Sequence, residues 1–101
     1  MRTIGYLSME IGLDASIPTY AGGLGILAGD TVRAAADLGL TFVAATLLYR
    51  DGYFTQRIDA QGQQTEVPTA WNPERSLEPV DALVSVPIFG RRVYIRAWRR
   101  I

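Results

Sequence analysis

Three residue types that build many active sites are missing from this sequence: cysteine, histidine and lysine. Without cysteine the chain can form no disulfide, thiolate nucleophile or cysteine-bound metal site. Without histidine it lacks the commonest general base and metal ligand. Every basic residue is arginine, so no Schiff base can form on this polypeptide. Any acid–base chemistry must therefore come from Asp, Glu, Tyr and backbone groups, and we expect no metal site.

Long apolar runs and a charge imbalance are also missing. No stretch approaches the roughly 20 apolar residues of a membrane span, and the N-terminus has no signal-peptide pattern. Ten basic residues balance ten acidic ones. The charge therefore indicates neither nucleic acid nor a membrane as a partner, and we expect a cytoplasmic protein. Because 49% of the residues are hydrophobic, the chain is globular rather than disordered.

Glycine, in contrast, is concentrated in residues 18–30 (PTYAGGLGILAGD), just ahead of an apolar run that ends at Leu38. A cluster of glycines marks backbone that turns sharply or approaches another group closely. Where such a loop opens a helix, the first N–H groups have no internal partners and favour an anion, usually phosphate. The alternative is a tight turn that lets the helix pack on a sheet. The spacing alone leaves both interpretations open.

The first half of the chain predicts a β–α–β unit over residues 3–49. Residues 3–7 form a short β-prone run, which we expect to be a buried strand. A helix follows from Leu24, where apolar residues recur at helical spacing, and Gly39 fits its C-terminal stop. Residues 40–49 are almost wholly apolar, as in a buried parallel strand. The apolar helix positions are Leu24, Leu27, Ala28, Val32, Ala35 and Ala36.

Glu10 follows the first strand. In open α/β sheets the carboxyl ends of the strands form the ligand crevice, which makes Glu10 a candidate site residue. The alternative is an exposed loop acid without a role in binding. Its position in the sequence does not decide between the two.

The second half predicts two β-hairpins within residues 53–98. Residues 53–58 pair with 63–67 around a turn at 59–62, and residues 82–89 pair with 93–98 around 90–92. Four breaking residues make 68–80 irregular: Pro68, Asn72, Pro73 and Pro79. One β–α–β unit and two hairpins cannot cover both faces of a sheet. We therefore expect the chain to be the start of a larger protein.

Two common phosphate-binding motifs do not fit. Residues 23–28 match G-x-G-x-x-A, but some ten loop residues separate them from the strand, and the next acid after the helix, Asp51, comes too late. A nicotinamide or flavin enzyme is therefore disfavoured. The Walker motif needs a Gly-Lys pair, so the absence of lysine excludes a nucleoside triphosphatase of that form.

Several linked motifs carry a family resemblance that covers essentially the whole chain. They are residues 8–12 (SMEIG), 18–30, 35–39 (AADLG) and 48–59 (LYRDGYFTQRID). In this order they resemble the N-terminal region of the α-glucan (glycogen, starch, maltodextrin) phosphorylases, and most the shorter bacterial type. The resemblance implies an α/β fold in which residues 1–101 are part of the N-terminal Rossmann-like lobe of a GT-B glycosyltransferase.

The resemblance also implies a function for the full-length protein. The family releases glucose 1-phosphate from α-1,4-glucan ends by phosphorolysis, with pyridoxal 5′-phosphate acting through its own phosphate. The implied partners are the glucan, inorganic phosphate and glucose 1-phosphate, and a homo-oligomer is expected. The family's cofactor lysine lies beyond residue 101, so this chain alone should hold no complete catalytic set and be inactive.

Carried over residue by residue, the resemblance assigns the site. The backbone N–H groups of Gly22 and Gly23 would face phosphate, while Glu10, Leu24 and Leu27 would border the glucose pocket. Phosphorolysis passes through an oxocarbenium-like sugar, so positioned dipoles suit it without a titrating side chain. Two alternatives remain: a glycogen or starch synthase-like GT-B transferase, which usually carries lysine just before the glycines, and a non-catalytic carbohydrate-binding or assembly module.

Overall fold

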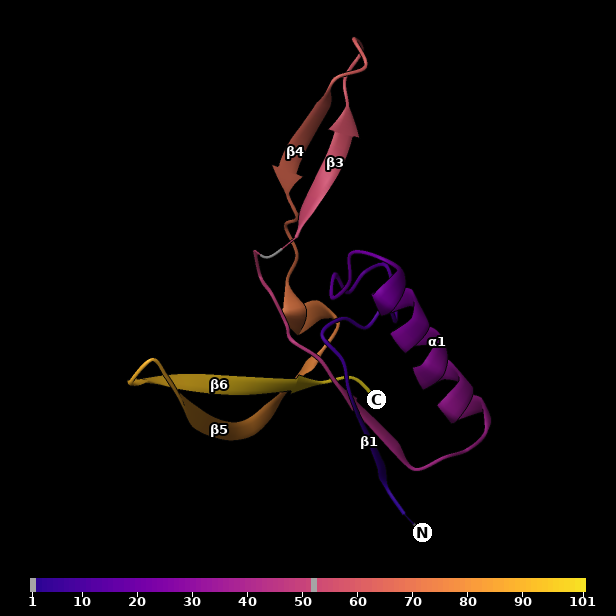
Figure 1. The fold of residues 1–101 in the computed structure, drawn as a ribbon, viewed down its shortest axis with the longest axis vertical. Helices are drawn as coiled ribbons and strands as arrows, with labels where there is room; N and C mark the ends of the chain where they lie inside the picture. The colour runs from indigo at the N-terminus through magenta and orange to yellow at the C-terminus, as the bar shows by residue number, and fades with distance from the viewer. Residues whose placement is uncertain (1, 52) are drawn as a thin grey trace. The chain divides into compact units, whose positions relative to one another are not determined.

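The computed structural model describes residues 2–51 and 53–101. The order of elements is strand, helix, strand and then two hairpins (Figure 1). The chain divides into two compact units, Met1–Trp71 and Asn72–Ile101. No helix within the described residues is long and apolar enough to cross a membrane.

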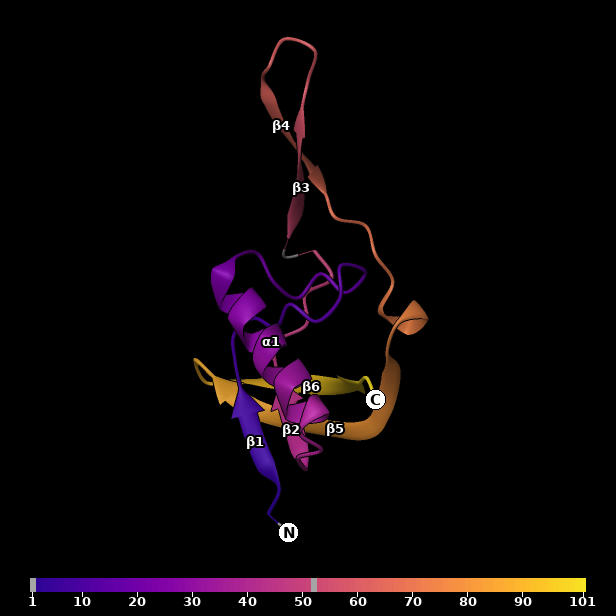
Figure 2. The same cartoon turned by 90° about the vertical axis from the view of Figure 1, so that its right-hand side faces the viewer.

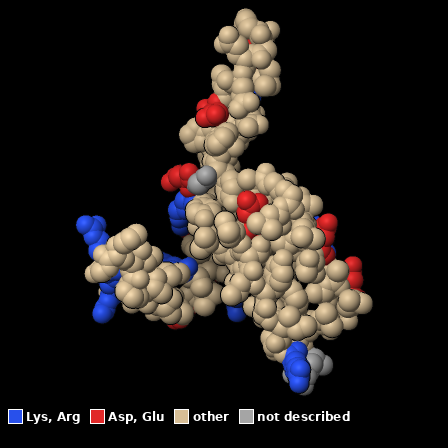
Figure 3. Space-filling model, viewed as in Figure 1, with Lys and Arg blue, Asp and Glu red and all other residues tan. Residues whose placement is uncertain are grey.

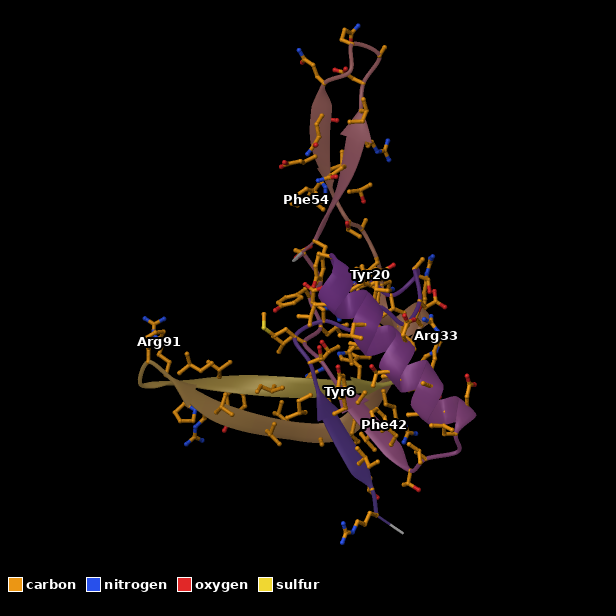
Figure 4. The ribbon with its side chains drawn as sticks, turned by 45° about the vertical axis from the view of Figure 1, so that its right-hand side comes forward. Tyr6, Tyr20, Arg33, Phe42, Phe54 and Arg91 are labelled. Carbon is orange, nitrogen blue, oxygen red and sulfur yellow. The ribbon has the colours of Figure 1, made fainter. Side chains whose placement is uncertain are left out.

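The first unit begins with the predicted β–α–β arrangement. Strand β1 (Ile4–Leu7) pairs in parallel with β2 (Phe42–Ala45), and helix α1 (Gly23–Asp37) connects them and packs on β2. Figures 1 and 2 both show α1 running alongside the strand pair. The register places Tyr6 opposite Ala44, and the Tyr6 ring lies 5.9 Å from that of Phe42. Figure 4 shows these two rings close together. The parallel pairing predicted from the sequence is therefore confirmed.

The predicted burial of these strands is wrong. Along β1 only Tyr6 is partly buried, and Leu7 is 85% exposed. Along β2, half-buried and exposed positions alternate. The described sheet holds only these two strands, so neither strand is enclosed between neighbours. Both strands are also shorter than the apolar runs that predicted them.

The helix ends as predicted. Leu38 is the C-cap, and Gly39 follows with a φ of 66°. The N–H of Gly39 donates to the carbonyl of Ala36, and the N–H of Leu40 donates to that of Ala35. This pair of bonds is a Schellman motif, and its left-handed residue is the position where glycine is preferred.

The core of this unit lies between α1 and the loop after β1. Its buried apolar residues are Ile11, Ile17, Ala28 and Ala35. The buried Thr19 links the two arms of the loop through two hydrogen bonds to Ile11. The N–H of Ile11 donates to the carbonyl of Thr19 at 3.2 Å, and the Thr19 hydroxyl donates to the carbonyl of Ile11 at 2.7 Å. The Arg33 guanidinium also donates to the carbonyl of Leu13, which fastens the loop to the helix. Most of the helix's contact face consists of small residues.

The first hairpin is close to its prediction. Strands β3 (Phe54–Ile58) and β4 (Gln64–Pro68) are antiparallel, with Ile58 opposite Gln64. The Asp59 carboxylate accepts the N–H groups of Gln61 and Gln63 and so stabilises the turn.

The second unit is a longer hairpin than predicted. A 3-10 turn (Pro73–Arg75) precedes β5 (Glu78–Ile88), which pairs with β6 (Arg91–Arg99). Residues 68–80 are therefore only partly irregular. The register is interrupted between Pro79 and Leu83, which accommodates a proline near the start of β5. Figure 3 shows basic side chains gathered over this hairpin.

Candidate functional site

The glycine-rich loop leads directly into α1. Gly22 is the N-cap residue and extended, and its carbonyl accepts the N–H groups of Gly25 and Ile26. Because the N-cap residue is a glycine, it has no side chain that could cap the helix. Figure 4 shows Tyr20, from the preceding loop, beside the first turn of α1. The loop and the helix start are thus one continuous structure.

The Glu10 carboxylate lies against this helix start. Its Oε2 accepts the N–H of Ala21 at 3.1 Å and that of Gly22 at 3.4 Å. The main chain at Glu10 is itself held by Ser8, whose hydroxyl donates to the Glu10 carbonyl at 2.7 Å. A carboxylate near the N-terminus of a helix is favoured by the unpaired N–H groups and the dipole. The Glu10 carboxylate therefore binds the residues at the start of the predicted phosphate loop.

The next two amides are open. The N–H groups of Gly23 and Leu24 donate to no other residue in the described part of the chain. Gly22 and Gly23 are exposed, and a Cβ atom added to either would meet nothing within 4 Å. Two outward N–H groups on an uncovered backbone are the geometry that an anion requires.

The glycines that follow are packed instead. The carbonyl of Gly25 accepts the N–H of Gly12 at 2.7 Å. A Cβ atom on Gly25 would overlap the Tyr20 side chain, and one on Gly29 would overlap the backbone carbonyl of Gly12. The close-packing interpretation of the glycine cluster therefore holds for Gly25 and Gly29, and the anion-binding interpretation stays a prediction for Gly22 and Gly23.

The two leucines assigned to the site project from the same helix without being part of its buried face. Leu24 is 52% exposed and Leu27 is 63% exposed. The buried positions of α1 are Gly25, Ala28, Gly29 and Ala35. Ile26 and Leu38 are exposed to a similar extent, 48% and 74%, so exposure alone does not distinguish the two leucines and their role stays a prediction.

A hollow of about 480 Å³ borders the loop. It reaches the loop at Ala21 and does not include Gly22 or Gly23; its lining is Ala15, Pro18, Tyr20, Ala21, Tyr53, Phe54, Thr55, Gln56 and Thr69. Burial first, then the charge of Glu10 and the nearby Tyr49, raise the pKa of Tyr53 above its usual value. The tyrosine rings at 49 and 53 meet edge to face at 5.7 Å. Sequence reasoning did not single out Tyr20 or Tyr53, because aromatic residues near a predicted turn carry no distinctive motif.

Together these features define an α/β protein with a parallel β–α–β unit. Glu10 and the glycine loop lie where the first strand has ended and the helix begins, the edge at which open α/β sheets bind ligands. The loop presents free amides, and exposed leucines lie beside it.

Comparison with known proteins finds similarity to a part of several phosphorylases. Maltodextrin phosphorylase of Thermococcus litoralis is 48% identical over 100 residues, covering 92% of this chain and 12% of that protein. Glycogen phosphorylase of Mycobacterium tuberculosis (strain H37Rv) is 46% identical over 71 residues, covering 70% of this chain and 8% of the relative. Glycogen phosphorylase of Aquifex aeolicus is 32% identical over 106 residues, covering 96% of this chain and 15% of the relative.

The chain is therefore homologous to the α-glucan phosphorylases over most of its length, and it spans a small part of them. The resemblance inferred from the sequence motifs is confirmed. No family model matches the chain, and no solved structure matches it. The mixed α/β fold is as expected.

Proposed function

We propose that this chain is part of an α-glucan phosphorylase, in which its glycine loop faces the reacting phosphate. The full enzyme releases glucose 1-phosphate from α-1,4-glucan ends with inorganic phosphate. This segment forms part of the N-terminal Rossmann-like lobe of a GT-B fold. The observation that carries the proposal is the pair of free amides at Gly23 and Leu24, in a chain homologous to phosphorylases.

The chemistry of phosphorolysis matches what the loop offers. The reacting sugar develops positive charge, and the phosphate beside it must be held in position by fixed charges or dipoles. Backbone N–H groups at a helix start do this with a fixed dipole and no titrating group. A chain without Cys, His or Lys supplies this kind of electrostatic stabilisation and leaves proton transfer to other parts of the enzyme.

The residues of the site have separate roles in this proposal. Gly22 and Gly23 leave the backbone without side chains, so that phosphate oxygens reach the free N–H groups of Gly23 and Leu24 directly. The N–H of Gly22 already lies 3.4 Å from Glu10, at the long end of the hydrogen-bond range, so Gly23 contributes most. Leu24 and Leu27 give the glucose unit an apolar surface, and Glu10 borders the same pocket.

Pyridoxal 5′-phosphate is implied in the full enzyme by the homology. When bound, it supplies a phosphate group beside the substrate phosphate. This chain cannot hold the cofactor as a Schiff base because it contains no lysine. The free amides of Gly23 and Leu24 fit a phosphate group, so this segment would bind and orient phosphate.

The complete protein encoded with this segment tests the proposal. We expect it to form glucose 1-phosphate from maltodextrin only when inorganic phosphate is present, as measured with a coupled assay. Residues 1–101 alone should show no activity. Transfer of glucose from a nucleotide sugar, without phosphate-dependent cleavage, would contradict the proposal and indicate a synthase.

A further inference from the structure

The Glu10 side chain lies against the glycine-rich loop, next to Gly25 and Ala21. It passes over Gly25, where an added Cβ atom would come within 3.1 Å of Oε2 and 3.3 Å of the Glu10 Cβ. Its carboxylate then reaches the N–H groups of Ala21 and Gly22. The absence of a side chain at Gly25 thus leaves room for the Glu10 side chain beside the loop, although an added Cβ atom would overlap Tyr20 more severely.

The rest of the segment 10–12 is bound to the same loop. The N–H of Ile11 donates to the carbonyl of Thr19, and the N–H of Gly12 donates to that of Gly25. Hydrogen bonds from three consecutive residues therefore meet the loop before, at and after its glycines. Of the three, only the Glu10 bonds come from a side chain, and they hold the two residues that directly precede the free amides of Gly23 and Leu24.

We infer that Glu10 is a positioning residue: its carboxylate fixes Ala21 and Gly22 so that the amides of Gly23 and Leu24 point outward for phosphate. This inference rests on the proposed function. The carboxylate occupies one pair of amides and leaves the next pair for the external anion. One Glu10 oxygen, Oε2, accepts both bonds, so in this inference the side chain acts on phosphate through the loop.

The inference separates two roles that Glu10 could have at this place. A positioning residue needs an acceptor oxygen at the position of Oε2, which glutamine also provides. A residue that binds the sugar through its charge needs the carboxylate itself. Glu10→Gln and Glu10→Ala therefore distinguish the two roles, and Glu66→Ala, the same change at an exposed position on β4, is the matched control.

The experiment uses the complete protein and two readouts. We expect Glu10→Ala to speed hydrogen–deuterium exchange in the peptide spanning residues 20–25 and to raise the KM for phosphate about tenfold, the effect of about one charge-assisted hydrogen bond, because the bond to Gly22 is long. The KM for maltodextrin should stay within about twofold of the wild-type value, because a residue that positions the phosphate loop does not bind the glucan. Glu10→Gln should restore both readouts most of the way, and Glu66→Ala should change neither.

Other results would overturn the inference. A raised KM for maltodextrin, with unchanged exchange in residues 20–25, would make Glu10 a substrate contact. Faster exchange with an unchanged KM for phosphate would make it purely structural. If Glu10→Ala does not fold, Glu10→Asp provides the test, because its carboxylate is set back by one methylene and should show the same two changes in weaker form. A wild-type protein without phosphorolysis would refute the proposed function, whereas exchange would still report whether Glu10 holds the loop.

Discussion

Two pairs of glycines in the same loop and helix have opposite surroundings. Gly22 and Gly23 are bare on the outside, with nothing within 4 Å of an added Cβ atom, whereas Gly25 and Gly29 lie against other backbone and side chains. The first pair is not needed for packing in this chain, and the second pair is. The comparison shows that one glycine-rich motif has two kinds of surroundings: open backbone at its start, where we propose that phosphate binds, and close helix packing after it.

The packed pair should give the largest effect on stability. An alanine at position 29 would place its Cβ closer than 3.0 Å to the backbone carbonyl of Gly12, which cannot move aside as a flexible side chain can. We expect Gly29→Ala to destabilise α1 by about 3 kcal/mol, at the upper end of overpacking effects. Hydrogen–deuterium exchange of the α1 amides in the complete protein measures this change. Unchanged protection of α1 would show that the loop and helix are less tightly packed than described.

A smaller effect is expected at the far end of the helix. Gly39 has open space around it but a φ of 66°, so its glycine is required by backbone conformation and not by packing. Gly39→Ala should destabilise the helix end by about 1 kcal/mol. Gly39→Asn is the matched variant, because asparagine tolerates this conformation better and should cost less. Exchange rates of the amides of Gly39 and Leu40 report the difference; equal losses for Ala and Asn would argue against backbone strain as the cause.

The elements themselves could be predicted from the sequence. The helical spacing of Ala28, Val32 and Ala35, the stop at Gly39 and the turn at 59–62 each reflect local physics that acts over a few residues. The parallel pairing of β1 and β2 follows from the helix between them. Local signals were therefore sufficient for the β–α–β unit and both hairpins.

Burial and the details of the site depend on contacts that are distant in sequence. The bond between Glu10 and Ala21 joins residues eleven apart, and no motif announces it. The different surroundings of Gly23 and Gly29 cannot be predicted from the sequence either. The backbone of Gly12 lies against Gly29, whereas nothing lies within 4 Å of a Cβ atom added to Gly23. The apolar composition of 40–49 indicated a buried strand, yet burial requires neighbouring strands that the described sheet does not contain.

The exposed pair provides the most direct test of this account. In the complete protein, Gly23→Ala should leave the stability of α1 unchanged within about 0.5 kcal/mol, because alanine meets no atom there and is a better helix former than glycine. The same change should lower kcat/KM for phosphate at least about tenfold, since its methyl group stands where phosphate must approach the amide. A wild-type kcat/KM for phosphate in a folded Gly23→Ala protein would contradict the claim that this bare backbone faces the reacting phosphate.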